Sequence, residues 1–300
     1  MTEQITENEG ERTRRRRKRR DLILLILLFL AVVAISVSLF FYATCRPAVA
    51  PVTAPAGVSV PHFVFSIDNI AEPLAVTASP LGDRIFVSEG TGDKRILVFD
   101  RAGKPIGSIT IPLANPLQER SPDALTVGTD NRLYVILSSQ HEVLIYTLGR
   151  ELVGLFRPDN DPNFQWFPTS LAMDKAGNIY VTDQTEGRHR VLVFDTTGKL
   201  VLKFGISGTG NGMFLFPSDI LVDSQGRIFV ADSSNTRIQV FDSQGKFLNV
   251  IYGTGLSLPR SLIMDSEGRL HVLDSLGQSV AVVTLGNPVR IQYRYGALGR

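Results

Sequence analysis

Two different hydrophobic patterns divide the chain. Residues 22–42 are almost continuously apolar, interrupted only by Ser36 and Ser38. From about residue 62 onward, apolar residues occur instead in short alternating runs between Gly, Asp, Asn and Ser. A continuous apolar run of about 20 residues is typical of a transmembrane helix, whereas short alternating runs between turn residues predict β-strands. The pattern therefore predicts a membrane helix followed by an all-β region.

The flanks of the apolar run predict its orientation. Residues 12–20 read Arg-Thr-Arg-Arg-Arg-Arg-Lys-Arg-Arg, and no comparable basic cluster follows residue 42. Basic residues stay on the cytoplasmic side of a membrane, and a cleaved signal peptide has a shorter apolar stretch. We therefore expect a basic cytoplasmic tail over residues 1–21 and a transmembrane helix over residues 22–43. The protein is predicted to be a single-pass plasma-membrane protein, with its N-terminus in the cytoplasm and the remainder extracytoplasmic.

A short segment separates this helix from the β region. Residues 44–61 are rich in Pro and Ala, a composition that favours an extended polyproline conformation. We expect a stalk that holds residues 62–300 away from the bilayer. Cys45, at the start of this segment, is interpreted either as an unmodified cysteine or as a lipidation site.

The β region is built of repeats. Five copies of one pattern follow each other, and a turn glycine recurs in them at positions 41 to 49 residues apart, a period typical of propeller blades. These glycines are Gly103, Gly149, Gly198, Gly245 and Gly286. The clearest copy, residues 216–253, contains four short apolar runs over residues 218–223, 227–232, 237–242 and 247–253. Turns of the Asp-Ser-Gln-Gly type join such runs as antiparallel hairpins, so the fold class predicted is an all-β propeller of four-stranded blades.

The same residues carry a family resemblance. Residues 216–246 resemble an NHL repeat, with Phe-Pro before the first strand, an Asp-x-x-Gly turn, Val-Ala-Asp at the end of the second strand and Asn-x-Arg-Ile-Gln-Val-Phe in the third. NHL propellers commonly have six blades, so the resemblance implies a sixth position beyond the five copies. We expect residues 62–68 to form the outer strand of that sixth blade, with its other strands located beyond Arg300, or else a five-bladed ring with a spare strand. NHL proteins include membrane receptors, RNA-binding proteins and a zinc amidating lyase, so the resemblance implies fold more than function.

Composition and charge narrow the functional classes. The chain has 44% hydrophobic and 20% charged residues, which is typical of a globular protein. Of 31 basic and 29 acidic residues, 8 and 5 lie in residues 1–21, leaving 23 and 24 in the remainder. This balance is too even for binding a phosphate backbone, so no nucleic-acid partner is predicted. With one cysteine, the chain forms no internal disulfide and no cysteine-rich zinc module.

One rim of the propeller is predicted to carry the binding site. The loops that lead into the inner strands and the loops between the second and third strands emerge on the same face of a four-stranded meander. Acidic residues recur there at the ends of the second strands, where they either cap the following turn or line a calcium site. The rim candidates are Glu89, His141, Trp166, Asp183, His189, Asp232, Asn235 and Asp274.

Three of these candidates have their own alternatives. His141 and His189 fall at equivalent places in successive copies, which resembles the zinc-binding histidines of the amidating lyase, but a catalytic zinc needs about three protein ligands. They are otherwise ordinary histidines. Trp166, the only tryptophan, either anchors a partner or packs between blades.

The predicted function is a membrane-anchored binding module for a protein, peptide or glycan on the rim, acting as a sensor or scaffold. No complete catalytic set occurs in the sequence, and no cofactor is predicted. The alternative is a membrane-tethered propeller enzyme, either a zinc-dependent lyase or a calcium-dependent hydrolase of the lactonase type.

Overall fold

A computed structural model describes residues 63–112, 120–161, 163–251, 255–286 and 289–296. The predicted cytoplasmic tail, the membrane helix over 22–43 and the stalk over 44–61 lie outside these residues. Within the described residues, no helix has the length and apolar character needed to cross a bilayer.

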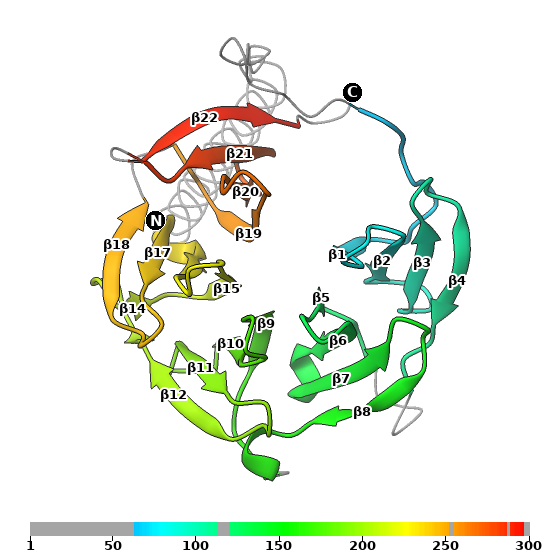
Figure 1. The fold of residues 1–300 in the computed structure, drawn as a ribbon, viewed down its shortest axis with the longest axis horizontal. Coiled ribbons are helices and arrows are strands. Elements are labelled where there is room, and N and C mark those ends of the chain that lie inside the picture. The colour runs from blue at the N-terminus through cyan, green and yellow to red at the C-terminus, as the bar shows by residue number, and fades with distance from the viewer. Residues whose placement is uncertain (1–62, 113–119, 162, 252–254, 287–288, 297–300) are drawn as a thin grey trace, which may run out of the picture. The chain divides into compact units, whose positions relative to one another are not determined.

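The described chain forms five antiparallel four-stranded sheets, each following the order of the sequence. This confirms the predicted propeller of four-stranded blades, and Figure 1 shows the blades placed in succession around a ring. We number them blade 1 to blade 5. Blade 1 comprises β1 (Pro73–Ala78), β2 (Arg84–Glu89), β3 (Ile96–Asp100) and β4 (Pro105–Ile109); blade 2 comprises β5 (Ala124–Val127), β6 (Arg132–Leu137), β7 (Glu142–Thr147) and β8 (Leu152–Phe156). Blade 3 comprises β9 (Pro168–Met173), β10 (Ile179–Asp183), β11 (Arg190–Phe194) and β12 (Leu200–Phe204); blade 4 comprises β15 (Pro217–Val222), β16 (Ile228–Asp232), β17 (Arg237–Phe241) and β18 (Phe247–Ile251). Blade 5 comprises β19 (Pro259–Met264), β20 (Leu270–Asp274), β21 (Ser279–Thr284) and β22 (Arg290–Tyr295).

Shorter elements lie in the loops. The pair β13 (Ile206–Ser207) and β14 (Met213–Phe214) is parallel and precedes blade 4. Single 3-10 turns are η1 (Ser138–Gln140), η2 (Pro158–Asn160) and η3 (Ser233–Asn235).

The hairpin turns follow from their Asp-x-x-Gly sequences. In blade 4 the Asp223 carboxylate accepts hydrogen bonds from the backbone N–H groups of Gln225 and Arg227, both at 2.9 Å. Gly226 takes a φ of +79°, which an L-residue rarely adopts. The aspartate replaces backbone hydrogen bonds that the turn lacks, so the turn places β15 and β16 in register.

Apolar clusters fill the spaces between neighbouring blades. Each of the four interfaces from blade 1 to blade 5 contains buried side chains from both blades. Between blades 4 and 5, for example, Phe229 and Ile238 pack with Leu270 and Val272. Alternate residues of one strand face opposite sides of its sheet, so each blade buries its two faces against different neighbours.

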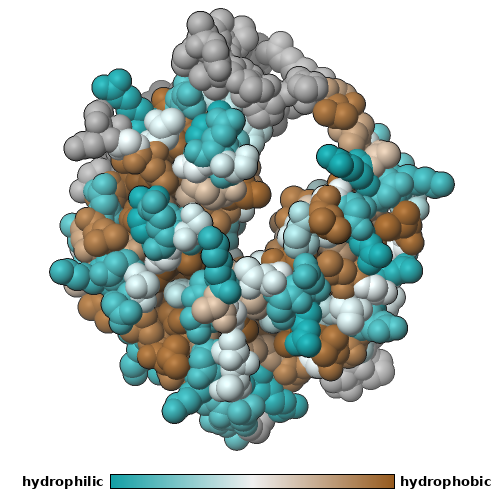
Figure 2. All heavy atoms as spheres, in the orientation of Figure 1, coloured by the Kyte–Doolittle hydropathy of each residue, from teal (hydrophilic) through white to brown (hydrophobic). Residues whose placement is uncertain are grey.

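The ring of described blades is open between blade 5 and blade 1 (Figure 1). The space-filling view shows the passage through the middle of the ring (Figure 2). Of the strand predicted over residues 62–68, the described residues 63–68 belong to no strand, so this prediction is wrong for them. Phe65 nevertheless packs on Gly103 of blade 1, where an added Cβ would lie 2.5 Å from its ring. Phe204 of blade 3 has the same relation to Gly245 of blade 4.

Candidate functional site

The predicted rim candidates lie in the loops of one face, which we call the rim face, or at the strand ends that lead into them. Acidic residues stand at the C-terminal ends of four second strands: Glu89 on β2, Asp183 on β10, Asp232 on β16 and Asp274 on β20. All four are buried, and the three aspartates are 0% exposed. They therefore lie beneath the rim surface rather than on it.

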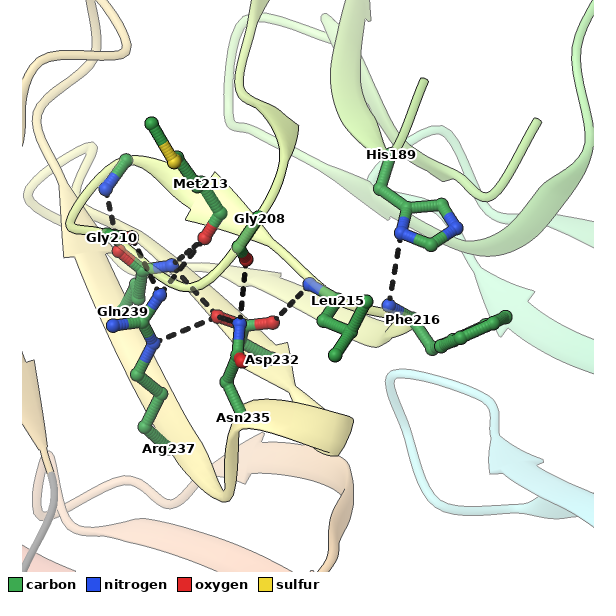
Figure 3. Close-up of polar contacts among 11 residues, drawn as sticks. His189, Gly208, Gly210, Met213, Leu215, Phe216, Asp232, Asn235, Arg237 and Gln239 are labelled. Atoms are coloured by element: carbon green, nitrogen blue, oxygen red, sulfur yellow. Dashed lines mark hydrogen bonds and ion pairs between the residues drawn. The ribbon is translucent and has the colours of Figure 1, made fainter. Parts of the chain in front are cut away.

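Asp232 joins three segments of blade 4 (Figure 3). Its Oδ1 accepts from the backbone N–H of Leu215 at 2.7 Å, in the loop that leads into β15. Its Oδ2 accepts from Asn235 Nδ2 at 2.9 Å, Arg237 Nε at 2.8 Å and Gln239 Nε2 at 2.9 Å. One carboxylate thus holds the leading loop, the loop after β16 and the strand β17 together.

The partners of Asp232 extend this network to the glycine-rich loop over residues 205–214. Asn235 Nδ2 donates to the Gly208 carbonyl at 3.0 Å, and Arg237 donates to the carbonyls of Gly210 at 2.7 Å and Met213 at 3.0 Å. These bonds satisfy three carbonyls of the loop with side chains of blade 4, so they hold the loop against that blade.

The same arrangement recurs in neighbouring blades. Asp183 Oδ1 accepts from the backbone N–H of Phe167 at 2.8 Å and of Thr185 at 2.9 Å, and its Oδ2 accepts from Arg190 Nε at 2.7 Å. Asp274 accepts from the backbone N–H of Leu258 at 2.9 Å. The predicted capping of the following turn is thus only part of their role, since these aspartates also bind the preceding loop.

These contacts do not fit a calcium site. Glu89 pairs with Arg95 at 3.1 Å, and Asp183, Asp232 and Asp274 each contact an arginine as well. A calcium ion needs six to eight oxygen ligands without competing cations.

His189 is 6% exposed and contacts the next blade through its ring. Its Nδ1 lies 3.2 Å from the backbone nitrogen of Phe216 and accepts that hydrogen (Figure 3). The neutral ring must then carry its own hydrogen on Nε2. A histidine that binds zinc offers a nitrogen without hydrogen and donates from the other nitrogen, so His189 does not fit this role.

His141 does not complete a metal site either. It is exposed, and its ring packs edge-to-face on Phe167 with a centroid distance of 5.5 Å. Among the described residues, no group of three or more His, Cys, Asp or Glu side chains could hold a metal ion.

Trp166 is 4% exposed and packs between blades 2 and 3, which corresponds to the second of its two predicted roles. Its Nε1 donates to the His141 carbonyl at 2.8 Å, and its ring lies near Phe156, Phe164 and Phe194. It is therefore not available as an exposed anchor.

Phe216 is an aromatic residue of this face that does reach solvent. Its side chain is 51% exposed, its φ is +52°, and its ring lies 4.7 Å from that of His189. A bulky residue rarely adopts a positive φ, and such backbone strain is often found at binding sites. In the sequence, Phe216 was recognisable only as part of the Phe-Pro motif, although a motif position directly before an inner strand indicates a rim location.

The centre of the ring holds a further carboxylate that the sequence analysis missed. Asp219, on the inner strand β15, accepts from Ser170 of β9 and from the backbone N–H of Leu262 on β19 at 2.7 Å. Burial raises the pKa of Asp219, while its hydrogen bonds act in the opposite direction. Asp219 therefore joins the inner strands of three blades.

Comparisons with known sequences identify two of the repeats. Residues 166–194 and 214–241 match the NHL repeat. Peptidyl-glycine alpha-amidating monooxygenase A of Xenopus laevis is 28% identical over 193 residues, which cover 57% of this chain and 20% of that protein. The probable peptidyl-alpha-hydroxyglycine alpha-amidating lyase pgal-1 of Caenorhabditis elegans is 32% identical over 127 residues, 41% of this chain and 32% of that protein. The chain thus spans about a third or less of the length of these relatives.

Solved structures agree on the architecture. The virginiamycin B lyase of Staphylococcus aureus aligns with a TM-score of 0.55 at 16% identity, covering 76% of this chain and 70% of the lyase. At that identity the likeness concerns the fold alone. The two segments that match the NHL repeat contain the first three strands of blades 3 and 4, so the chain is a β-propeller in which two blades match that repeat.

Proposed function

We propose that the propeller is the ligand-binding module of a single-pass membrane protein, and that its rim face binds a peptide segment of its ligand. The observation that carries the proposal is Phe216, a half-exposed aromatic ring held in a strained conformation on a buried histidine. Exposed aromatic side chains commonly provide the anchor of a binding surface. The amidating relatives, whose names refer to peptidyl substrates, support a peptide as the ligand.

Rigidity of the surrounding loops supports the same proposal. The buried Asp232 and Asp183 networks fix the loops beside Phe216 before any ligand arrives. Prior ordering reduces the entropy lost on binding, so a rigid rim suits recognition of a ligand.

The proposal is tested on an array of random hexapeptides with free and amidated C-termini, using the full-length chain. The variant is Phe216→Asn, because asparagine tolerates a positive φ and lacks the ring. The control is Leu248→Ala, which removes a side chain that is 49% exposed on the outer strand β18. We expect the peptides bound by the wild type to be lost with Phe216→Asn and kept with Leu248→Ala. Equal binding by all three proteins would contradict a rim site at Phe216.

A second candidate function is an amidating-lyase activity, favoured by the alignment with the amidating relatives over 57% and 41% of the chain. His189 and His141 do not fit a shared zinc site, so this candidate would need another arrangement of ligands. Incubation with an α-hydroxyglycine-extended peptide and zinc tests it. Formation of amidated peptide by the wild type would favour the enzyme over the binding module.

Membrane anchoring is part of the proposal. Its support is the apolar run over residues 22–42 and the basic cluster before it.

A further inference from the structure

A cavity of about 330 Å³ lies between blades 2 and 3. It is lined by the turns β5–β6, β9–β10 and β11–β12, which are the hairpins opposite to the rim face. Small-molecule sites have volumes from roughly 300 to 1,000 Å³, so this cavity is large enough for a small ligand.

Phe156, which lines the cavity, lies farther from its turn glycine than the corresponding phenylalanine of the next blade does. At Gly245 of blade 4, an added Cβ would lie 2.5 Å from the Phe204 ring. At the equivalent Gly198 of blade 3, an added Cβ would lie 3.6 Å from the Phe156 ring. The nearest atom at Gly198 is instead the Arg157 carbonyl oxygen, at 3.3 Å.

The polar side of the cavity carries an excess of positive charge. Arg132 and Arg157 line it together with one carboxylate, that of Asp130. Asp130 already accepts from Tyr134 Oη at 2.9 Å and from the backbone N–H of Arg132 at 3.2 Å, and it lies 3.8 Å from Arg132 Nε. Arg132 is therefore partly neutralised.

Arg157 differs from Arg132 because its guanidinium makes no hydrogen bond or ion pair with any described residue. Asn160 and Thr196, which also line the cavity, likewise have side chains without hydrogen bonds to the described part of the chain. All three line the cavity and are exposed residues. One free cation and two free hydrogen-bonding groups suit a carboxylate.

The backbone that carries Asn160 is held in place. Asp159 and Asn160 have φ values of +51° and +54°. The Asp159 N–H donates to the Gly198 carbonyl at 2.7 Å, and its carboxylate accepts from the Leu200 N–H at 2.6 Å. The segment after β8 is thereby fixed against the β11–β12 turn.

The opposite side of the cavity is apolar. Ile145, Leu155, Phe156, Met173 and Ile179 line it. Aromatic and thioether side chains pack well against an aromatic ring. We propose that this cavity binds a small organic acid, with its carboxylate on Arg157 and its apolar body against Phe156 and Met173.

Methyl NMR of methionine tests the proposal on the full-length chain in detergent micelles. The chain has four methionines, and only Met173 of them lines the cavity. The probe is 3-phenylpropanoate, with 3-phenylpropanamide as the neutral match. We expect saturable shifts of the Met173 methyl signal with the acid, much weaker binding of the amide, and no shift of Met213 or Met264.

Two variants locate the binding groups. Arg157→Gln should weaken binding of the acid by about 10- to 100-fold, because a charge-assisted hydrogen bond is lost. Thr196→Trp should block the cavity. The matched control, Arg188→Gln, removes an exposed arginine on the rim face and should leave the affinity unchanged.

A third variant tests the charge balance. Asp130→Asn removes the only carboxylate in the lining and should strengthen binding by about fivefold. The proposal is overturned if the amide binds as well as the acid, if inorganic phosphate competes equally, or if Arg188→Gln weakens binding as much as Arg157→Gln. These results are independent of Phe216, so the rim proposal stands or falls separately.

Discussion

The carboxylate of Asp232 accepts four hydrogen bonds while being fully buried, and one of its donors is the guanidinium of Arg237, which is 5% exposed. A buried ion pair contributes little net stability compared with apolar residues, but removing one partner leaves the other charge buried without compensation. The stability of the rim therefore depends on the pair remaining complete.

We predict that Asp232→Ala lowers the free energy of unfolding by about 3–5 kcal/mol. The measurement is urea unfolding followed by circular dichroism. Glu186→Ala, which removes an exposed carboxylate from the rim loop of blade 3, serves as the control and should change stability by less than about 0.5 kcal/mol. Equal effects of the two substitutions would contradict a structural role for the buried carboxylate.

Because of Asp265 in blade 5, the stability of the protein is expected to depend on pH. Burial raises its pKa, but hydrogen bonds from His271 Nε2 at 2.9 Å and Arg269 Nε at 2.6 Å, together with backbone donors, outweigh burial and hold the pKa well below the ordinary 3.8. A carboxyl group with a lowered pKa in the folded state stabilises the protein above the pKa of the unfolded chain. This contribution is lost as the pH falls below about 5.

We therefore expect Asp265→Asn to reduce the loss of stability between about pH 5 and pH 2. Urea midpoints measured across that range for the wild type and the variant test the prediction. Glu151→Gln, at an exposed carboxylate of blade 2, should leave the loss of stability at acid pH unchanged. A variant curve parallel to that of the wild type would show that Asp265 does not contribute.

At the scale of elements, the hairpin turns and the wedges between blades use glycine for two different reasons. Gly226 and Gly245 have similar φ values, +79° and +73°. An added Cβ at Gly226 would have its nearest neighbour at 3.8 Å, in Ser243, whereas one at Gly245 would lie 2.5 Å from the Phe204 ring of the preceding blade. Only Gly245 is required for packing as well as for backbone conformation.

We predict that Gly226→Ala costs about 1 kcal/mol, from the left-handed backbone alone. Gly245→Ala should cost about 1–3 kcal/mol more, because the methyl group would force Phe204 to move. Urea unfolding of the two variants measures the difference directly. Equal losses would mean that the contact between blades 3 and 4 relaxes without cost.

Local elements could be predicted from the sequence because their causes are local. The four strands of blade 4 were expected over residues 218–223, 227–232, 237–242 and 247–253, and the structure has them within two residues of those limits. Alternation of apolar residues and Asp-x-x-Gly turns determine such elements without reference to distant residues.

The candidate site was less predictable because its contacts join distant residues. Asp232 binds the Leu215 N–H, and His189 Nδ1 accepts from Phe216 of the next blade, 27 residues away. Repeat spacing placed His141 and His189 at equivalent positions, but it contained no information about which ring nitrogen accepts a hydrogen bond. Spacing likewise could not show that Trp166 is buried and Phe216 exposed.

At the scale of the molecule, each described blade depends on its neighbours for burial, since every apolar cluster combines residues of two blades. Blade 1 lacks a described neighbour on one side, and Phe65 covers Gly103 there in the manner of an outer-strand phenylalanine. The segment before β1 therefore belongs to the packing of the ring, and the stalk predicted over residues 44–61 leads directly into it.

The side of the membrane on which the propeller lies therefore depends on the predicted membrane helix. Residues 22–42 follow eight basic residues, so we predict that the N-terminus is cytoplasmic and the propeller extracytoplasmic. Cys45 is the only cysteine and follows the predicted helix closely, which makes its thiol a reporter of sidedness.

A membrane-impermeant maleimide should label the wild type in intact cells. In a Cys45→Ser background, Thr13→Cys should be labelled only after permeabilisation, because it lies within the basic tail. Deleting residues 22–43 should move the protein from the alkaline-washed membrane pellet to the supernatant. Labelling of Thr13→Cys in intact cells would reverse the orientation, and retention of the deletion variant in the pellet would rule out these residues as the anchor.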